Sequence, residues 1–134
     1  MTAKNVSDTA VTIIRREAKL IEEYGWYHKI EDNLAARKGA FGLNLSLAAC
    51  WAVYGEPCQP RDLDSRQSEI VAEILEIIEV GLRMTAIEYE ARFADAYAGH
   101  VAHDLRLVAE NLEKEILSGG TKLKRPLSPY GYGT

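Results

Sequence analysis

The chain has 134 residues, of which 47% are apolar and 27% charged, and its net charge at pH 7 is −4. This length and composition are typical of one soluble globular domain with its own core. The longest apolar run, residues 43–54, is too short to span a bilayer, and residues 1–8 are polar. We therefore expect neither a membrane segment nor a signal peptide, and a cytoplasmic location.

The charge is distributed unevenly along the chain. Residues 118–134 have three basic side chains, Lys122, Lys124 and Arg125, and no acidic one; the rest of the chain therefore carries −7. An acidic body argues against nucleic-acid binding, which depends on a basic surface. The basic tail also has Tyr130 and Tyr132. It is either a solubilising end or, as we predict, a segment that binds another protein.

The first predicted helix is capped by Ser7 or Thr9 and ends at Gly25. Its apolar residues recur every three or four positions, as in a helix with one buried stripe. They are Val11, Ile14, Ala18 and Ile21. The aromatic residues around Trp26 favour a packed corner over a binding platform. Residues 30–38 are mixed and charged, and predict a short helix or a loop.

The next segment has two overlapping patterns. Residues 41–47 alternate between large apolar and small or polar side chains, as strands do, whereas residues 47–54 are rich in Ala and Leu. We favour a buried central helix, capped by Asn44 and ended by Gly55, over a strand at residues 41–47. Cys50 would pack in this helix and Cys58 in the loop after it, both reduced rather than joined in a disulfide.

Asp64 and Gln67 have a spacing suited to a capping box, which predicts the start of a long helix. The expected core face of this helix is Val71, Ile74, Leu75, Ile78 and Leu82. Gly81 predicts either a close contact with another helix or a bend. Helical character continues over residues 87–97, and Gly99 is expected to separate this part from the last helix.

The last helix has a regular apolar stripe and ends at Gly119-Gly120. The stripe consists of Val101, Leu105, Val108, Leu112 and Ile116. Together these patterns predict one all-α domain of four or five helices over residues 1–118, followed by a tail over residues 119–134. The helix at residues 45–54 is expected to be central, with the helices that begin near Ser65 and His100 packed on it.

Three side chains that can bind a metal ion lie together at the start of the last helix: His100, His103 and Asp104. Imidazole and carboxylate groups bind zinc, manganese or iron. Further ligands could come from Glu73, Glu76, Glu88 or Asp95. The simpler interpretation is ordinary polarity at a helix start, where a carboxylate such as Asp104 interacts favourably with the helix dipole.

One stretch resembles a known family. Residues 18–26, Ala-Lys-Leu-Ile-Glu-Glu-Tyr-Gly-Trp, are similar to the start of small helical proteins of actinobacteria and their phages. Residues 45–55 resemble that family's Leu/Ala-rich helix, and Phe93-Ala94-Asp95 and Asp104-Leu105 its later elements. The chain departs from the family at Ala94, where the family has Asn, in its Cys-Leu-Gly-Ala centre and in a longer stretch after Arg61. The family has no assigned activity, so the resemblance implies a bacterial or phage context rather than a mechanism.

The sequence has no Gly-rich phosphate loop, nucleophile elbow or Cys-x-x-Cys pair. We therefore expect a non-enzymatic accessory protein without a cofactor, which acts by binding another protein or a second copy of itself. The alternative is a metal-dependent hydrolase of nucleotides or phosphoesters that uses a divalent ion at His100, His103 and Asp104.

Overall fold

The computed structural model describes residues 3–26 and 40–118, and all regular elements in these two ranges are helical. In chain order they are α1 (Ala3–Tyr24), α2 (Ala40–Tyr54), a 3-10 turn (Pro60–Asp62), α3 (Ser65–Leu82), α4 (Ala86–Arg92) and α5 (Ala98–Leu117). The predicted all-α class is confirmed. No helix within these ranges is long and apolar enough to cross a bilayer.

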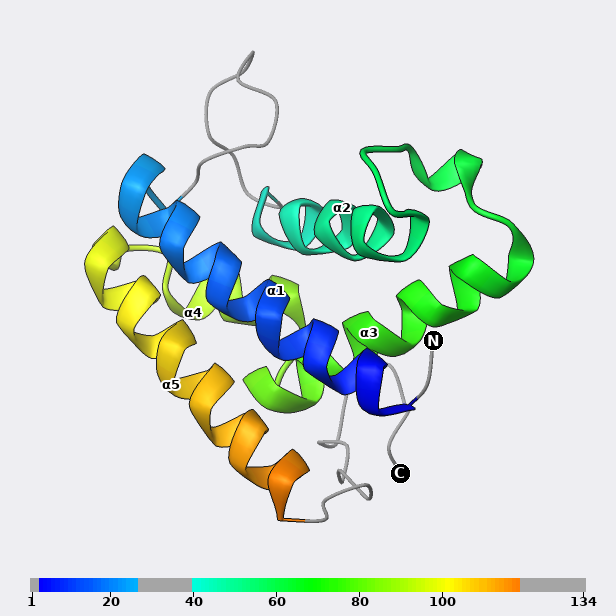
Figure 1. Cartoon of the computed structure of the whole chain (residues 1–134). Helices are drawn as coiled ribbons and strands as arrows, with labels where there is room; N and C mark the ends of the chain where they lie inside the picture. The colour runs from blue at the N-terminus through cyan, green and yellow to red at the C-terminus, as the bar shows by residue number, and fades with distance from the viewer. Residues whose placement is uncertain (1–2, 27–39, 119–134) are drawn as a thin grey trace.

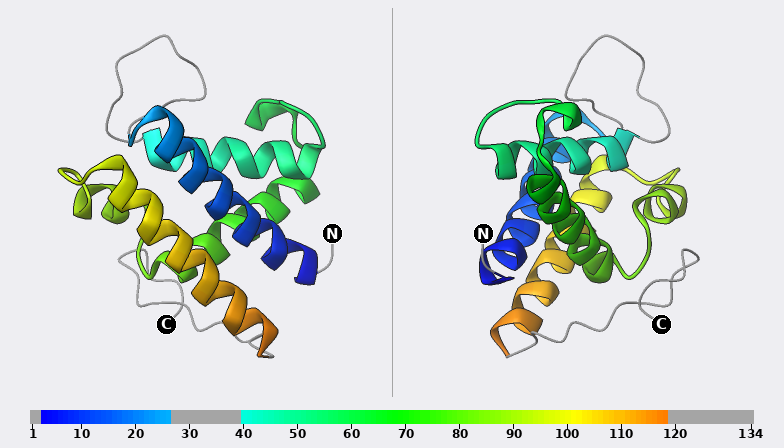
Figure 2. Two further views of the ribbon diagram at one scale, coloured as in Figure 1. Left: turned by 60° about the vertical axis from the view of Figure 1, so that its left-hand side comes forward. Right: turned by 90° about the vertical axis from the view of Figure 1, so that its right-hand side faces the viewer.

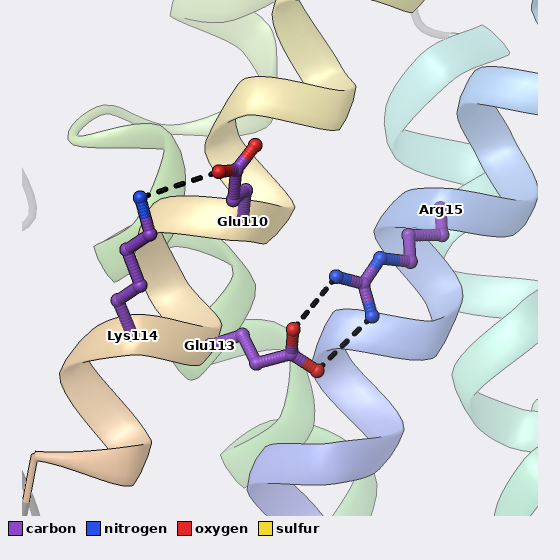
Figure 3. Close-up of polar contacts among 4 residues, drawn as sticks. All are labelled: Arg15, Glu110, Glu113 and Lys114. Carbon is purple, nitrogen blue, oxygen red and sulfur yellow. Dashed lines mark hydrogen bonds and ion pairs between the residues drawn. The ribbon is translucent and has the colours of Figure 1, made fainter.

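The longest helices, α1 and α5, lie side by side and run in opposite directions (Figures 1 and 2). Alanines on both helices are fully buried and allow the two backbones to approach closely: Ala10, Ala18, Ala102 and Ala109. Two bidentate ion pairs border this interface. Arg15 donates to Glu113 at 2.9 and 3.1 Å (Figure 3), and Arg106 donates to Glu22 at the same two distances.

The helix α2 crosses above α1 and α3 in Figure 1 and packs on both of them. The prediction that the helix beginning near Ser65 packs on α2 is therefore confirmed. The last helix, in contrast, packs mainly on α1. The prediction that α2 is the common centre is wrong, because the alanines of α1 and α5 let these two helices form the most extensive contact.

Several helix ends agree with the sequence predictions. Gly25 and Gly55 have φ angles of 103° and 96°, the left-handed conformation that ends α1 and α2. The backbone N–H of Gln67 donates to the Asp64 carboxylate at 2.8 Å, and the side-chain oxygen of Gln67 accepts from the backbone N–H of Asp64 at 3.0 Å. This reciprocal pair confirms the capping box at the start of α3.

Three predicted boundaries are wrong. The first helix begins at Ala3, before the predicted caps, and the Thr9 hydroxyl donates to the Asn5 carbonyl within the helix at 2.6 Å. Asn44 lies inside α2 rather than at its cap, and residues 41–47 are helical. Gly99 lies in the first turn of α5, so it does not separate the helices. The predicted short helix or loop at residues 30–38 lies outside the described residues.

The core is formed by all five helices. The predicted stripe of α1 is buried, as is the predicted face of α3 apart from Leu75, which is half-buried. In α5, Val101, Leu105 and Leu112 are buried, while Val108 and Ile116 pack at the margin. Gly81 makes a close helix contact, because a Cβ atom there would lie 3.1 Å from Cδ2 of Leu112.

Candidate functional site

A concave surface lies between the first half of α1 and the second half of α2. It is a groove of about 650 Å³. The apolar part of its lining is Ile13, Ala48, Trp51 and Ala52. Three charged side chains also line it, the acids Asp8 and Glu56 and the base Arg16. We call this surface the α1–α2 groove.

The composition of α2 explains why the groove is apolar. Its sequence, AFGLNLSLAACWAVY, has only Asn44 and Ser46 as amide or hydroxyl residues before the terminal Tyr54, and Asn44 is buried. A helix that is apolar all round is normally covered on every side. Here Leu43 remains 53% exposed, and Ala52 is also exposed in the groove. The helix therefore presents apolar surface beyond what the core requires.

Trp51 fixes one wall of the groove. Its indole N–H donates to the Cys58 carbonyl at 3.0 Å, which holds the loop after α2 against the helix. The chain can turn back at this point because Gly55 adopts its left-handed conformation. The next residues of this loop, Glu56 and Pro57, thereby become part of the groove wall.

The predicted metal-binding residues lie in the first two turns of α5. The Asp104 carboxylate accepts a hydrogen bond from the Tyr89 hydroxyl at 2.7 Å. The His100 ring lies 5.7 Å from the Phe93 ring, centre to centre, and His103 is exposed. Across residues 3–26 and 40–118, no three His, Cys, Asp or Glu side chains are placed to share a metal ion. The metal site therefore stays a prediction from sequence.

One of the proposed further ligands, Glu88, has partners within its own helix start. Glu88 accepts from the Thr85 amide at 3.2 Å, and the Glu88 amide donates to the Thr85 hydroxyl at 3.1 Å. This capping box starts α4, so Glu88 has a structural role there.

The predicted partner-binding side chains lie outside the described residues: Lys122, Lys124, Arg125, Tyr130 and Tyr132.

An aromatic cluster fills the space beneath the start of α5. Tyr89 stacks on Phe41 with 5.2 Å between ring centres and lies 4.7 Å from the Phe93 ring. Trp26 meets Phe41 edge-on at 5.3 Å and donates its indole N–H to the Phe93 carbonyl at 2.8 Å. Trp26 is buried, which confirms the predicted packed corner for this residue, whereas Tyr24 is 69% exposed and Tyr27 lies outside the described residues.

Tyr89 is also buried in this cluster, and its burial affects the chemistry of its hydroxyl. Desolvation raises the pKa of its hydroxyl well above the ordinary value of 10, and the hydrogen bond to Asp104 raises it further. A phenol in this setting stays protonated at neutral pH and donates to the carboxylate. The Tyr89–Asp104 pair thus joins α4 to α5.

Two buried carboxylates were missed by the sequence analysis. Glu17 is 2% exposed and accepts from the Asn44 amide nitrogen at 3.4 Å, while Glu90 is 6% exposed and accepts from the Phe41 backbone amide at 3.3 Å. They connect α2 to α1 and α4. The signal for Glu17 was its position in the apolar stripe, three residues after Ile14 and four before Ile21.

Comparison of the chain with protein-family models, with curated proteins and with solved structures found no match.

Proposed function

We propose that this protein is a non-enzymatic accessory protein that acts by binding, and that the α1–α2 groove is its binding surface. The observation that carries the proposal is the groove itself. Its apolar lining comes mainly from α2, and its charged residues come from α1 and from the loop after α2. Grooves that combine an apolar lining with a few charged or polar groups are typical of binding surfaces.

The segment proposed to occupy the groove is the basic tail of a second copy of the chain. Its Lys122, Lys124 and Arg125 complement the acidic groove residues Asp8 and Glu56, which outnumber the one basic groove residue, Arg16. Electrostatic complementarity of this kind guides association and fixes the orientation of the partner.

The sequence of the tail also suits an aromatic groove. Pro126-Leu127-Ser128-Pro129 has the Pro-x-x-Pro spacing, and segments with this spacing bind as polyproline helices to grooves lined by aromatic side chains. Trp51 would be the aromatic contact. The groove residues Asn5 to Arg16 of α1 extend over about 16 Å, at 1.5 Å per helical residue. A polyproline segment of about five residues has this length.

If each copy gives its tail to the other, the assembly is a closed, two-fold symmetric dimer. Removal of residues 122–134 should convert this dimer to a monomer, as measured by light scattering at tens of micromolar. Ala52→Lys should have the same effect, because it places a fixed positive charge in the groove where the basic tail would bind.

Ala72→Lys is the matched control, since Ala72 is also an exposed helical alanine but does not line the groove. A synthetic peptide of residues 119–134 should bind the shortened chain and quench or shift Trp51 fluorescence. A full-length chain that is monomeric at 100 micromolar would exclude a second copy as the occupant. A dimer that survives loss of residues 122–134 would exclude the tail.

A further inference from the structure

Two cysteines meet where the loop after α2 folds back on the helix. Cys50 belongs to α2 and is 3% exposed, while Cys58 lies in the loop and is half-buried. The Cys58 thiol lies 3.7 Å from the Cys50 carbonyl oxygen, in position to donate a hydrogen bond to it. Since this oxygen and the Cys50 sulfur belong to the same residue, the two thiols occupy one corner of the molecule.

The backbone around the pair holds the two cysteines together. Trp51, the neighbour of Cys50, donates its indole N–H to the Cys58 carbonyl at 3.0 Å. The intervening turn passes through Gly55, Glu56 and Pro57, which are all exposed. An exposed turn can adjust without disturbing the core, so the cysteines can approach the separation that a disulfide requires.

We infer that Cys50 and Cys58 form a dithiol site that a peroxide converts to an intramolecular disulfide. This inference does not depend on the proposed binding function. It differs from the expectation from sequence alone, which kept both cysteines reduced because free thiols suit a cytoplasmic protein better than a disulfide does.

The oxidation proceeds in two balanced steps. The Cys58 thiolate attacks hydrogen peroxide, an S–O bond forms, the O–O bond breaks and hydroxide leaves, which gives a sulfenic acid at Cys58. The Cys50 thiolate then attacks the Cys58 sulfur, an S–S bond forms, the S–O bond breaks and a second hydroxide leaves. With the two thiol protons, the products are one disulfide and two water molecules. The thiols lose two electrons, and peroxide gains them.

The order of the steps follows from exposure. Cys58 is the more accessible thiol and reacts first with the oxidant, while Cys50 is buried and acts as the resolving thiol. Burial raises the pKa of both thiols, and the charges of Asp62 and Glu56 raise that of Cys58 further. The thiolate is scarce at neutral pH, so we expect slow oxidation that needs sustained exposure to peroxide.

The test is to treat the full chain with hydrogen peroxide at pH 8.5 and to follow thiols, mass and size together. Both thiols should be lost with a mass decrease of two hydrogens, and peptide mapping without reductant should join the segments that contain Cys50 and Cys58. The subunit should run as a single chain on non-reducing denaturing gels, and dithiothreitol should restore both thiols. The melting temperature of the oxidised form should rise by about 5 °C, since the bond closes a short loop.

Two single variants serve as controls. In Cys50→Ser, Cys58 should proceed to sulfinic acid with a gain of two oxygens, because the resolving thiol is absent. In Cys58→Ser, Cys50 should stay reduced until the protein is unfolded. Disulfide-linked dimers of the unaltered chain, or oxygen addition at Cys58 with Cys50 still free, would overturn the inference.

Discussion

Gly81 lies where α3 passes close to the side chains of α5. An added Cβ would lie 3.1 Å from Leu112 and 3.5 Å from Val108. We therefore predict that Gly81→Val lowers the free energy of unfolding by about 1–3 kcal/mol, as overpacking does in well-packed cores. Urea denaturation measures this change.

Gly99→Ala is the comparison for Gly81→Val. No other atom lies within 4 Å of a Cβ at Gly99, so alanine there should be neutral or stabilise the helix by up to about 1 kcal/mol. A Gly81→Val chain as stable as the original would show that α3 and α5 can separate at no cost.

Tyr89 should make stability depend on pH in the alkaline range. Its pKa is raised in the folded chain, so above about pH 10 the unfolded chain releases this proton while the folded chain retains it. The contribution is complete below pH 10 and is lost as the pH rises further. Denaturation midpoints from pH 8 to 11 should fall more steeply for the original chain than for Tyr89→Phe. Equal slopes would contradict the role of Tyr89.

At the level of elements, the α1–α5 interface depends more on small residues than on ion pairs. Ala109 is fully buried between these helices, whereas the Arg15 and Glu113 side chains are 46% and 45% exposed. Exposed pairs contribute little because water and salt screen them. Ala109→Leu should therefore lower the denaturation midpoint more than Arg15→Gln combined with Glu113→Gln. The opposite order would show that charge holds the helices together.

The helices predicted best from the sequence have both a periodic apolar stripe and a residue that marks one end, such as a cap or a glycine. Gly25 marked the end of α1, and Asp64 and Gln67 marked the start of α3, because these residues act locally. The extent of α2 was misjudged because a helix that is apolar all round has no periodic stripe. Asn44, which was predicted to be the cap of this helix, instead reaches Glu17 in another helix.

The candidate site was less predictable than the fold. Both walls of the groove lie in segments that the sequence predicted to be helical, but their approach is a tertiary contact between α1 and α2 that no local pattern indicates. The cluster at His100 was visible in the sequence, yet the role of Asp104 was not. Its partner, Tyr89, comes from a different helix, and nothing in its spacing indicates this pairing.

For the whole molecule, the described core extends from Val6 to Ile116, and we predict that the tail adds nothing to its stability. A chain that lacks residues 122–134 should therefore melt within about 2 °C of the full chain when both are dilute enough to be monomeric. Dilution matters because association itself raises the apparent melting temperature. Scanning calorimetry measures this, and a much lower value would mean that the tail contributes to the fold.

The antiparallel pairing of α1 with α5 also has a consequence for synthesis on the ribosome. The first helix to emerge finds its most extensive partner only when the last one has been made. Until then, among the described elements, only α3 and α4 are available besides α1 and α2 themselves to cover the apolar stripe of α1 and the uniformly apolar α2. Nascent chains of this protein are therefore exposed to aggregation for most of their translation, and their demand for chaperones should end abruptly once α5 leaves the exit tunnel.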